Sequence, residues 1–532
     1  MRKNPLPYLA GLTCRAGGAA TIHQTQSYMT SKFMAGAGAC AAVLLLGTGC
    51  GKQELQELQR ESVVATANAR IAAADPSVDR IRSGHYIVIS ATAGSLPANL
   101  ARQLAAAGGT LTASMEKAGL AAVSSSRPDF AATAAKIAGV RSVIPDLTVQ
   151  GYDPASEKSV AVPQGVGNLS AGGEDDPGFD LQWGLKAIKA PQAWNAGYRG
   201  KGAVVAVLDT GFDLDHPDLA ANFLPGKNFV PGEELEFKGN DILSHGTHVA
   251  GIIAAADNGL GMIGVAPEAK ILPVKVLADD SGGAVSWIIQ GIMYAADQGA
   301  DVINMSFGGY VPRNGKFLDD KGTPDPSDDI IINNAKAVQE VLVAYSRATT
   351  YAYQQGATLI AAAGNNAIDL DKDQSFLYRP SGFPHVICIS ATAPKAWALD
   401  PVNANPDILA RYSNYGVSAI NFAAPGGDWS YYAIDPDRLT TVANVTLPVW
   451  VFDMVYSTNR DGGYRFANGT SMAAPHAAGV AALIVGKLGG NASAAQVESM
   501  MRASADDLGQ PGKDAIYGHG RVNAYRAVLN AQ

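Results

Sequence analysis

The stretch VVAVLDTG, residues 204–211, sets the fold class of this chain. Five apolar residues lead directly into the carboxylate of Asp209 and a Thr-Gly turn. A short apolar run of this kind, closed by a turn, predicts a strand buried on both faces of a sheet. Asp209 is then expected at the carboxyl end of that strand, where the functional groups of parallel α/β sheets gather.

Strands of the same kind recur along the chain, with helical segments between several of them. Further strands are expected at 271–277, 302–305, 358–362, 386–390 and 420–423. Helical spacing is found at 285–297 and at 335–355. Strands that alternate with helices predict a mainly parallel sheet covered on both faces, which is a three-layer α/β/α sandwich.

The composition is that of an acidic globular protein. The 532 residues are 47% hydrophobic and 17% charged, with a net charge of −8. The sequence has no basic cluster, and phosphate binding needs concentrated Lys and Arg, so nucleic acid is not expected as a partner. Of the four cysteines, three lie in the first 50 residues. Cys388 stands alone in an apolar run, which predicts a buried thiol and no disulfide within the folded domains.

Two further glycine-marked stretches supply a histidine and a serine. SHGTHVAG at 244–251 places His245 where a helix would begin, and NGTSMAAPH at 468–476 places Ser471 at another helix start. A serine hydroxyl is a weak nucleophile near neutral pH and needs a base, which in turn needs a group that fixes its tautomer. Ser471, His245 and Asp209 can fill the roles of nucleophile, general base and orienting carboxylate.

With these three motifs, residues 183–527 resemble the subtilisin-like serine proteases, or subtilases. The resemblance implies a subtilisin-like peptidase domain over residues 179–532. It also implies a serine endopeptidase that hydrolyses peptide bonds through an acyl-enzyme formed on Ser471. Two alternatives stay open: a pseudoprotease used as a binding module, and an esterase or peptide ligase that uses the same acyl-enzyme.

A fourth motif, AAAGNN at 361–366, ends a strand with the amide of Asn365. An amide donor there would stabilise the negative charge that develops on a carbonyl oxygen, together with the N–H group of Ser471. The resemblance implies that Asn365 is the oxyanion asparagine, and a simple capping role is the alternative. His248 follows His245 without the glutamate of a zincin motif, so we interpret it as packing or hydrogen-bonding support.

The resemblance also implies positions for substrate and calcium. The stretch VINMSFGG at 302–309 is similar to the subtilase strand that pairs with an extended peptide. Substrate-binding roles are expected for Ser306, Phe307, Gly308 and Gly364, around a pocket for an apolar side chain. A structural calcium ion would take oxygen ligands from Asp218, Asn258, Leu260 and Met262. The alternative is a polar turn that binds no cation.

Residues 1–50 are interpreted as a targeting segment, in which Met29 is a candidate start. The apolar stretch 34–46 suits the core of a signal peptide. The leucine run before Cys50 resembles a bacterial lipoprotein signal, in which the cysteine is acylated, and ordinary cleavage after a small residue is the open alternative. We therefore expect a secreted or cell-envelope protein, in the periplasm or at the outer membrane if Cys50 is lipidated.

Residues 51–79 are expected to form a polar tether, and 80–150 a small α+β ferredoxin-like domain. Its strands are expected at 85–90, 120–124 and 140–146, and its helices at 96–107 and 130–137. This order resembles the inhibitory propeptide of subtilases, with an unrelated α+β adaptor as the alternative. Residues 151–178 are rich in Gly, Pro and Ser and are predicted to be an exposed processing linker. The resemblance thus implies a zymogen, with its propeptide as intramolecular inhibitor and with peptides or proteins as substrates.

Two segments are longer than their equivalents in compact subtilases. Residues 310–355 contain five aspartates, and residues 426–467 are rich in aromatic side chains. Both follow segments that border the active site by resemblance. Our hypothesis is that they narrow the cleft or bind a second cation, and the alternative is that they are surface loops without a role.

Overall fold

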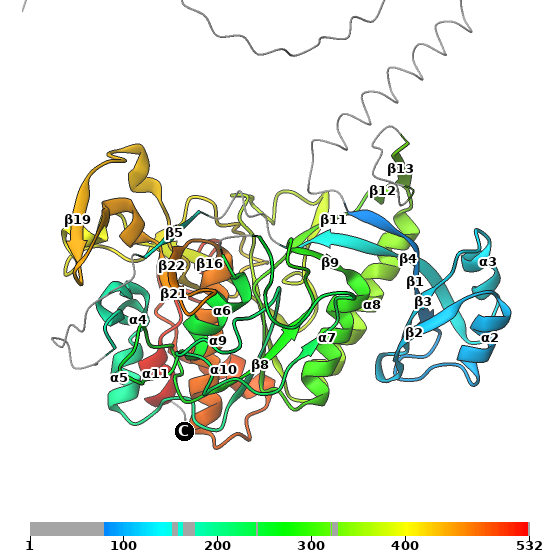
Figure 1. The fold of residues 1–532 in the computed structure, drawn as a ribbon, viewed down its shortest axis with the longest axis horizontal. Coiled ribbons are helices and arrows are strands. Elements are labelled where there is room, and N and C mark those ends of the chain that lie inside the picture. Colours follow the sequence, from blue (N-terminus) through cyan, green and yellow to red (C-terminus); the bar gives the residue numbers. More distant parts are fainter. Residues whose placement is uncertain are drawn as a thin grey trace, which may run out of the picture. The chain divides into compact units, whose positions relative to one another are not determined.

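An eight-stranded, mainly parallel sheet forms the centre of the computed structural model (Figure 1). Across the sheet, the strands are β17 (Ile408–Leu409), β16 (Val386–Ala393), β14 (Thr358–Ala362), β10 (Val302–Met305), β6 (Val204–Asp209), β8 (Lys270–Lys275) and β7 (Lys227–Asn228), with β18 (Phe422–Pro425) also beside β16. Every pair is parallel except β16 with β17. The predicted class of sheet is confirmed.

The structure describes residues 79–151, 158–162, 176–240, 243–319, 321 and 328–529. The predicted targeting segment 1–50, with Cys50, lies outside the described residues, as does the tether apart from Asp79.

The two faces of the sheet bury two separate cores, because successive side chains of a strand point to opposite faces. Val205 and Val207 belong to the first core, which contains α6 (His245–Ala254) and α9 (Thr470–Lys487). Ala206 and Leu208 belong to the second core, which contains α7 (Val285–Asp297) and α8 (Ala335–Gln354). Helices on both faces complete the expected three-layer sandwich.

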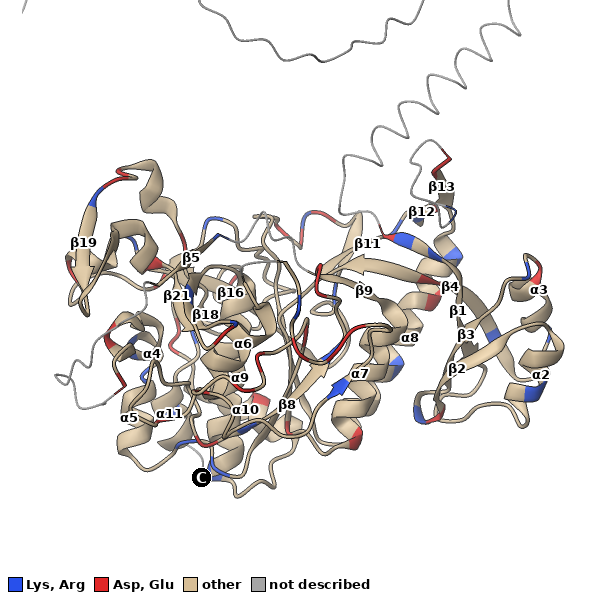
Figure 2. Ribbon diagram, in the orientation of Figure 1, with Lys and Arg blue, Asp and Glu red and all other residues tan. Residues whose placement is uncertain are grey.

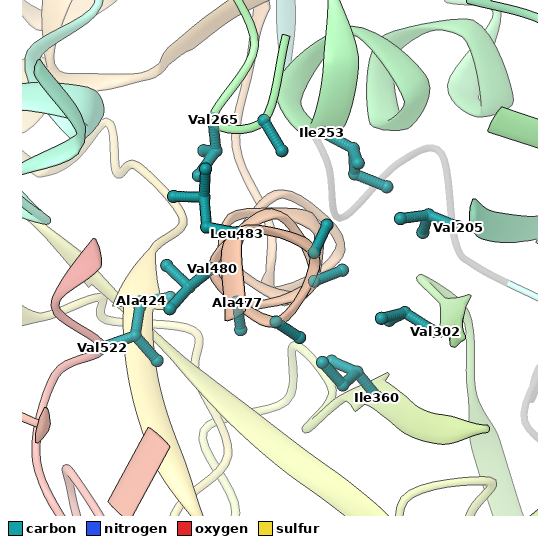
Figure 3. Packing of buried hydrophobic residues seen from close by; sticks show 14 of the residues in the cluster. Val205, Ile253, Val265, Val302, Ile360, Ala424, Ala477, Val480, Leu483 and Val522 are labelled. Atoms are coloured by element: carbon teal, nitrogen blue, oxygen red, sulfur yellow. The ribbon is translucent and has the colours of Figure 1, made fainter. Parts of the chain in front are cut away.

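Helix α9 is the most enclosed element of the first core. It is apolar on all sides, which is the pattern of a helix surrounded by protein. Val205, Val302 and Ile360 of the sheet approach it from one direction, and Ile253 and Val265 from another (Figure 3). Its small residues allow this close packing: a Cβ atom on Gly479 would lie 2.5 Å from the Cβ of Val265.

The predicted elements of the central layer agree closely with the structure. The helix expected at 285–297 is α7, and the one expected at 335–355 ends one residue earlier as α8. The strand expected at 420–423 begins two residues later, as β18. Ile420 precedes the strand and is apolar because it is buried against Ala363 and Cys388. Cys388 is a buried free thiol, as predicted.

Upstream of the central sheet, a second sheet has the strand order β4-β1-β3-β2, with antiparallel neighbours. Its elements in chain order are β1 (Arg80–Ser90), α2 (Leu100–Ala106), β2 (Thr110–Met115), β3 (Leu120–Ser124), α3 (Phe130–Ala134) and β4 (Val140–Gln150). Strand β2 was not predicted, because its sequence TLTASM is half polar and lacks the apolar run of a buried strand. It lies at the edge of the sheet.

The long segment after β10 contributes a hairpin to this second sheet. Strand β12 (Lys316–Asp319) pairs with β1 through Arg80 and Leu318, and it also pairs with β13 (Ile330–Asn333). The hairpin thus extends the upstream sheet.

No group of three or more His, Cys, Asp or Glu side chains suited to a metal is found in the described ranges.

Polar contacts join β4 to α7 and α8, the helices on one face of the central sheet. Arg141 forms an ion pair with Glu340 of α8 at 3.0 Å, and Ser142 Oγ donates to the same carboxylate at 2.8 Å. Asp146 accepts hydrogen bonds from the backbone N–H and hydroxyl groups of Ser286, at 3.1 and 2.7 Å. Ser286 lies in the first turn of α7, where the helix dipole also stabilises a carboxylate.

The remaining elements are short. They are β5 (Ser159–Ala161), α4 (Trp183–Ala187), α5 (Ala190–Asn195), β9 (Gly282–Ala284), β11 (Gly309–Pro312), β15 (Phe376–Arg379), β19 (Leu439–Val442), β20 (Val445–Pro448), β21 (Val455–Thr458), β22 (Tyr464–Ala467), α10 (Ala494–Ser504) and α11 (Ala524–Leu529). Basic and acidic residues are interspersed over the described part of the chain (Figure 2). In the described part of the chain, no helix is long and apolar enough to cross a membrane.

The enclosure of α9 leads to a prediction for stability. Leu483→Ala should lower the free energy of unfolding by about 2–5 kcal/mol, because a fully buried side chain leaves a cavity. Urea unfolding of the Ser471→Ala protein, which avoids self-digestion, would measure this. Leu439→Ala, at a side chain that is 62% exposed, is the matched control and should change the free energy by less than about 0.5 kcal/mol. Equal losses in the two variants would contradict the prediction.

Candidate active site

Asp209 and His245 are brought together by a strand end and a helix start. Asp209 is the last residue of β6 and His245 the first residue of α6. His245 Nδ1 lies 2.8 Å from Asp209 Oδ1, and both side chains are fully buried. The backbone N–H of Thr210 also donates to Asp209 Oδ1, at 2.7 Å. A carboxylate held in this way orients the imidazole and keeps the proton on Nδ1, which leaves Nε2 as the basic nitrogen.

Ser471 is the second residue of α9, whose first turn packs among the ends of the central strands. Ser306 Oγ, just beyond β10, donates to the carbonyl oxygen of Ser471 at 2.8 Å. Helix α6, which begins with His245, packs against α9. The three predicted catalytic residues therefore lie on elements that pack together at one edge of the sheet.

Asn365 is fixed by the residue that precedes Ser471. Its Oδ1 atom accepts hydrogen bonds from Thr470 N at 2.9 Å and from Thr470 Oγ1 at 2.7 Å. Because the oxygen is engaged there, Nδ2 is the end of the amide that can donate toward a substrate. Gly364 has a φ of 99°, and a Cβ atom on it would lie 2.5 Å from Tyr378 and from Asn414. The turn that presents Asn365 therefore requires glycine.

His248 is buried within α6, and its surroundings keep it neutral. Burial, together with the neighbouring His245, lowers the pKa of His248 to about 3. Its Nε2 atom lies 3.2 Å from the carbonyl oxygen of Arg465, which accepts the hydrogen bond. This contact suits the support role predicted for His248.

A segment of the chain itself lies along the predicted substrate strand. Gly308 N donates to the carbonyl oxygen of Gly151 at 2.7 Å, and Gly151 N donates to Ser281 O at 2.9 Å. Residues 148–150 of β4 pair antiparallel with β9. The side chain of Phe307 is 3% exposed and lies in the same apolar cluster as Val149. Gly308 is thus covered by the upstream segment, and Phe307 is buried.

A second stretch of the upstream segment is held by the strand that leads into the serine motif. Strand β5 pairs antiparallel with β22, which ends one residue before Asn468. Lys158 N donates to Asn468 Oδ1 at 3.0 Å. The predicted linker is therefore partly a strand. The six residues 152–157 between the two held ends lie outside the described part of the chain.

The predicted calcium residues lie close together, and a further carboxylate joins them. Asp218 Oδ2 accepts from Met262 N at 3.0 Å and from the Tyr464 hydroxyl at 2.8 Å, whereas its buried Oδ1 has no hydrogen-bond donor. Asp176, which the sequence did not single out, also has a buried oxygen without a donor and bonds the backbone of Gly259 at 3.1 Å. Leu260 N donates to Asn258 Oδ1 at 2.9 Å.

Burial also acts on the charges of these two carboxylates. It raises the pKa of Asp218 to about 6 and, with help from the neighbouring Asp257 and Asp218, the pKa of Asp176 to about 7. The contacts of Leu260 and Met262 are made by N–H groups, which shape the turn and cannot ligate a cation. Only their carbonyl oxygens are suited to that role.

Comparison with known proteins places this geometry in a family. The model of the subtilase family, peptidase S8, matches residues 200–520. Thermitase of Thermoactinomyces vulgaris is 33% identical over 356 residues, which span 66% of this chain and 98% of thermitase. Subtilisin BL of Lederbergia lenta is 34% identical over 348 residues, which span 65% and 98% of the two chains.

A solved structure extends the likeness of fold. The epidermin leader peptide processing serine protease of Staphylococcus aureus has a TM-score of 0.62 at 21% identity, covering 84% of this chain and 98% of that protein. With the family match, the resemblance predicted from the three motifs is confirmed. This chain belongs to the subtilase family and is a subtilisin-like serine endopeptidase.

Proposed function

We propose that Ser471, His245 and Asp209 form the catalytic triad of this endopeptidase. The observation that carries the proposal is the fully buried hydrogen bond of 2.8 Å between His245 Nδ1 and Asp209 Oδ1. His245 Nε2 takes the proton from Ser471 Oγ as that oxygen attacks the peptide carbonyl, and Asp209 stabilises the imidazolium. The protonated His245 then gives its proton to the leaving amine, and water hydrolyses the acyl-enzyme by the reverse route.

The oxyanion that forms in each step is assigned to two donors. Asn365 Nδ2 is one, because Thr470 holds the oxygen end of that amide. The second is the backbone N–H of Ser471, in the first turn of α9, where N–H groups have no partner within the helix. Thr470 thereby links the two donors: its hydroxyl also accepts from Gly364 N at 3.0 Å.

We further propose that the domain at residues 80–150 is an inhibitory propeptide. Its β4 strand and Gly151 engage β9 and Gly308 through backbone hydrogen bonds, the interaction that an extended substrate would make there. Because Gly151 is bonded to Gly308 and Lys158 to Asn468, both in segments that adjoin Ser471, the processing bond is assigned to the chain between them. Removal of the upstream domain would then open the cleft.

Calcium is proposed as a structural ion. The buried oxygens of Asp176 and Asp218 lack hydrogen-bond donors, and both carboxylates resist ionisation without a counter-charge. A hard cation would supply that charge, held by these carboxylates, by Asn258 Oδ1 and by the backbone carbonyl oxygens of Leu260 and Met262. Its contribution would be to the folded state and not to the chemical step.

The proposal also includes export, which is supported by the signal-like sequence of residues 1–50. Acylation of Cys50 would hold the precursor at the cell envelope, and ordinary signal cleavage would release it.

The triad and the processing site can be tested with one reagent and one variant. A serine-directed phosphonylating reagent should label Ser471 in the processed wild-type protein, and the Ser471→Ala protein should remain unlabelled and uncleaved. Mass spectrometry of the adduct and of the mature N-terminus would measure both. A processed protein with no label on Ser471 would contradict the triad, and a first cleavage outside residues 151–158 would contradict the processing site.

The oxyanion role of Asn365 predicts a specific kinetic defect. Asn365→Ala should lower kcat by about 10²–10³-fold and leave KM nearly unchanged, because the donor acts in the transition state. Asn366→Ala, at the exposed next residue, is the matched control and should keep the wild-type kcat. A variant that changes KM alone would show that Asn365 acts in ground-state binding.

The calcium assignment predicts a loss of thermal stability on chelation. For the Ser471→Ala protein, a chelator should lower the unfolding temperature, since an ion present at 100 times its Kd stabilises by about 2.7 kcal/mol. Asp218→Asn should reduce this shift, and Asp400→Asn, at an exposed carboxylate, should not. If the chelator leaves the unfolding temperature unchanged, no calcium ion contributes to the fold.

A further inference from the structure

The ammonium group of Lys158 is surrounded by three aromatic rings. Its Nζ atom lies 3.8 Å from the ring centroid of Trp429, 4.5 Å from that of Tyr432 and 5.7 Å from that of Trp450. Attraction between a cation and ring faces holds within about 6 Å of the centroid. The described residues place no carboxylate in an ion pair with Lys158. The three aromatic residues are called the cage below.

The cage stands beside the path of a peptide leaving the catalytic serine. Lys158 is held at its backbone by Asn468, three residues before Ser471, and the chain continues as β5 along β22. Gly151, earlier in the chain, is held at Gly308. Chain direction therefore makes Gly151 the amino-terminal flank of the processing bond and Lys158 its carboxyl-terminal flank.

The cage is a built feature of the long segment 426–467. Its rings meet edge to face, with centroids 6.0 Å apart for Trp429 and Tyr432 and 5.4 Å apart for Tyr432 and Trp450. The guanidinium of Arg411 also lies over the ring of Trp429, 3.2 Å from its centroid. Trp450 Nε1 donates to the carbonyl oxygen of Pro436 at 3.1 Å. These contacts fix the rings independently of Lys158.

The cage is open to solvent on one side. The ring of Tyr432 is 42% exposed, which leaves the cage accessible from solvent. An aromatic site of this kind selects a basic side chain over an apolar one of similar length.

We propose that the cage of Trp429, Tyr432 and Trp450 is a specificity subsite that binds a lysine or arginine side chain on the carboxyl-terminal side of the bond being cleaved. Lys158 occupies it in the precursor. Strands β5 and β22 pair through their backbones, with one side-chain bond from Arg465 Nη2 to Ser159 Oγ at 3.2 Å, so an extended substrate that follows this edge would present one side chain to the same rings. This inference rests on the proposed function, because it takes Ser471 as the point of cleavage.

Processed enzyme with Lys158→Ala, which keeps the lysine that remains on the mature chain out of the cage, is tested with quenched fluorescent peptides. The peptides share one cleavable core and differ only downstream of the scissile bond, where lysine or norleucine is placed at each of four positions in turn. At one of these positions lysine should raise kcat/KM about tenfold over norleucine, from a cation–aromatic contact. Tyr432→Leu and Trp429→Leu should reduce the ratio to about one, as expected when the rings supply that contact. Tyr353→Leu, a ring on α8 stacked on His385, is the matched control and should keep the wild-type ratio.

The outcomes separate the subsite from the catalytic proposal. Cleavage of the all-norleucine peptide and phosphonylation of Ser471 report that the enzyme is active and folded in every variant. Active enzyme without a lysine preference at any of the four positions would overturn the subsite, as would a preference that survives both cage substitutions. Failure to cleave any peptide would instead contradict the proposed function. Because Tyr432 is partly exposed, its variant gives a result even if Trp429→Leu does not fold.

Discussion

The burial of α9 is the constraint on which the rest of the molecule depends. A helix that is apolar on every side cannot face water, so strands and helices must close around it. The small side chains along it, such as Ala477 and Gly479, let the sheet and Val265 approach closely. Because the helix cannot shift within this packing, its first turn is fixed against the strand ends. Ser471, Thr470 and Asn365 inherit their relative positions from that packing.

The strand edges beside Ser471 form a second constraint, which acts on backbone groups. β9, Gly308 and β22 all present hydrogen-bonding groups that must find partners. In this structure the chain's own residues 148–151 and 158–161 supply them. Since a substrate would need the same groups, occupancy by the upstream segment and binding of a substrate exclude each other. The proposed inhibition would therefore need backbone complementarity and little sequence complementarity.

Much of the site follows from local sequence. Asp209 ends a run of five apolar residues, and His245 and Ser471 each follow a glycine or serine turn at a helix start, so their elements are visible in short windows. The bounds of α7 are equally local, since its apolar spacing stops where Gly299 follows. The three motifs lie far apart in the sequence, so only the family resemblance predicts that they form one site.

Other features depend on contacts between distant segments and have no local signal. Asp79 forms a buried ion pair with Arg379, and Lys158 meets rings near residues 430 and 450. Neither residue differs in its sequence context from an ordinary surface charge. Asp176 lies in a polar stretch like many others, and only the fold brings it to Asp218. Strand β2 is defined by its neighbour β3 and not by its own half-polar sequence.

The pairing of β1 with the β12–β13 hairpin has a consequence for the proposed maturation, because it decides which strand edge is exposed afterwards. The hairpin belongs to the peptidase part of the chain, but one of its edges is covered by the upstream domain. Departure of that domain would leave the edge of β12 open to any partner able to add a strand. An antibody raised against that edge would distinguish the activated form from the precursor without touching the active site, and so would serve as a reporter of maturation in a mixed population.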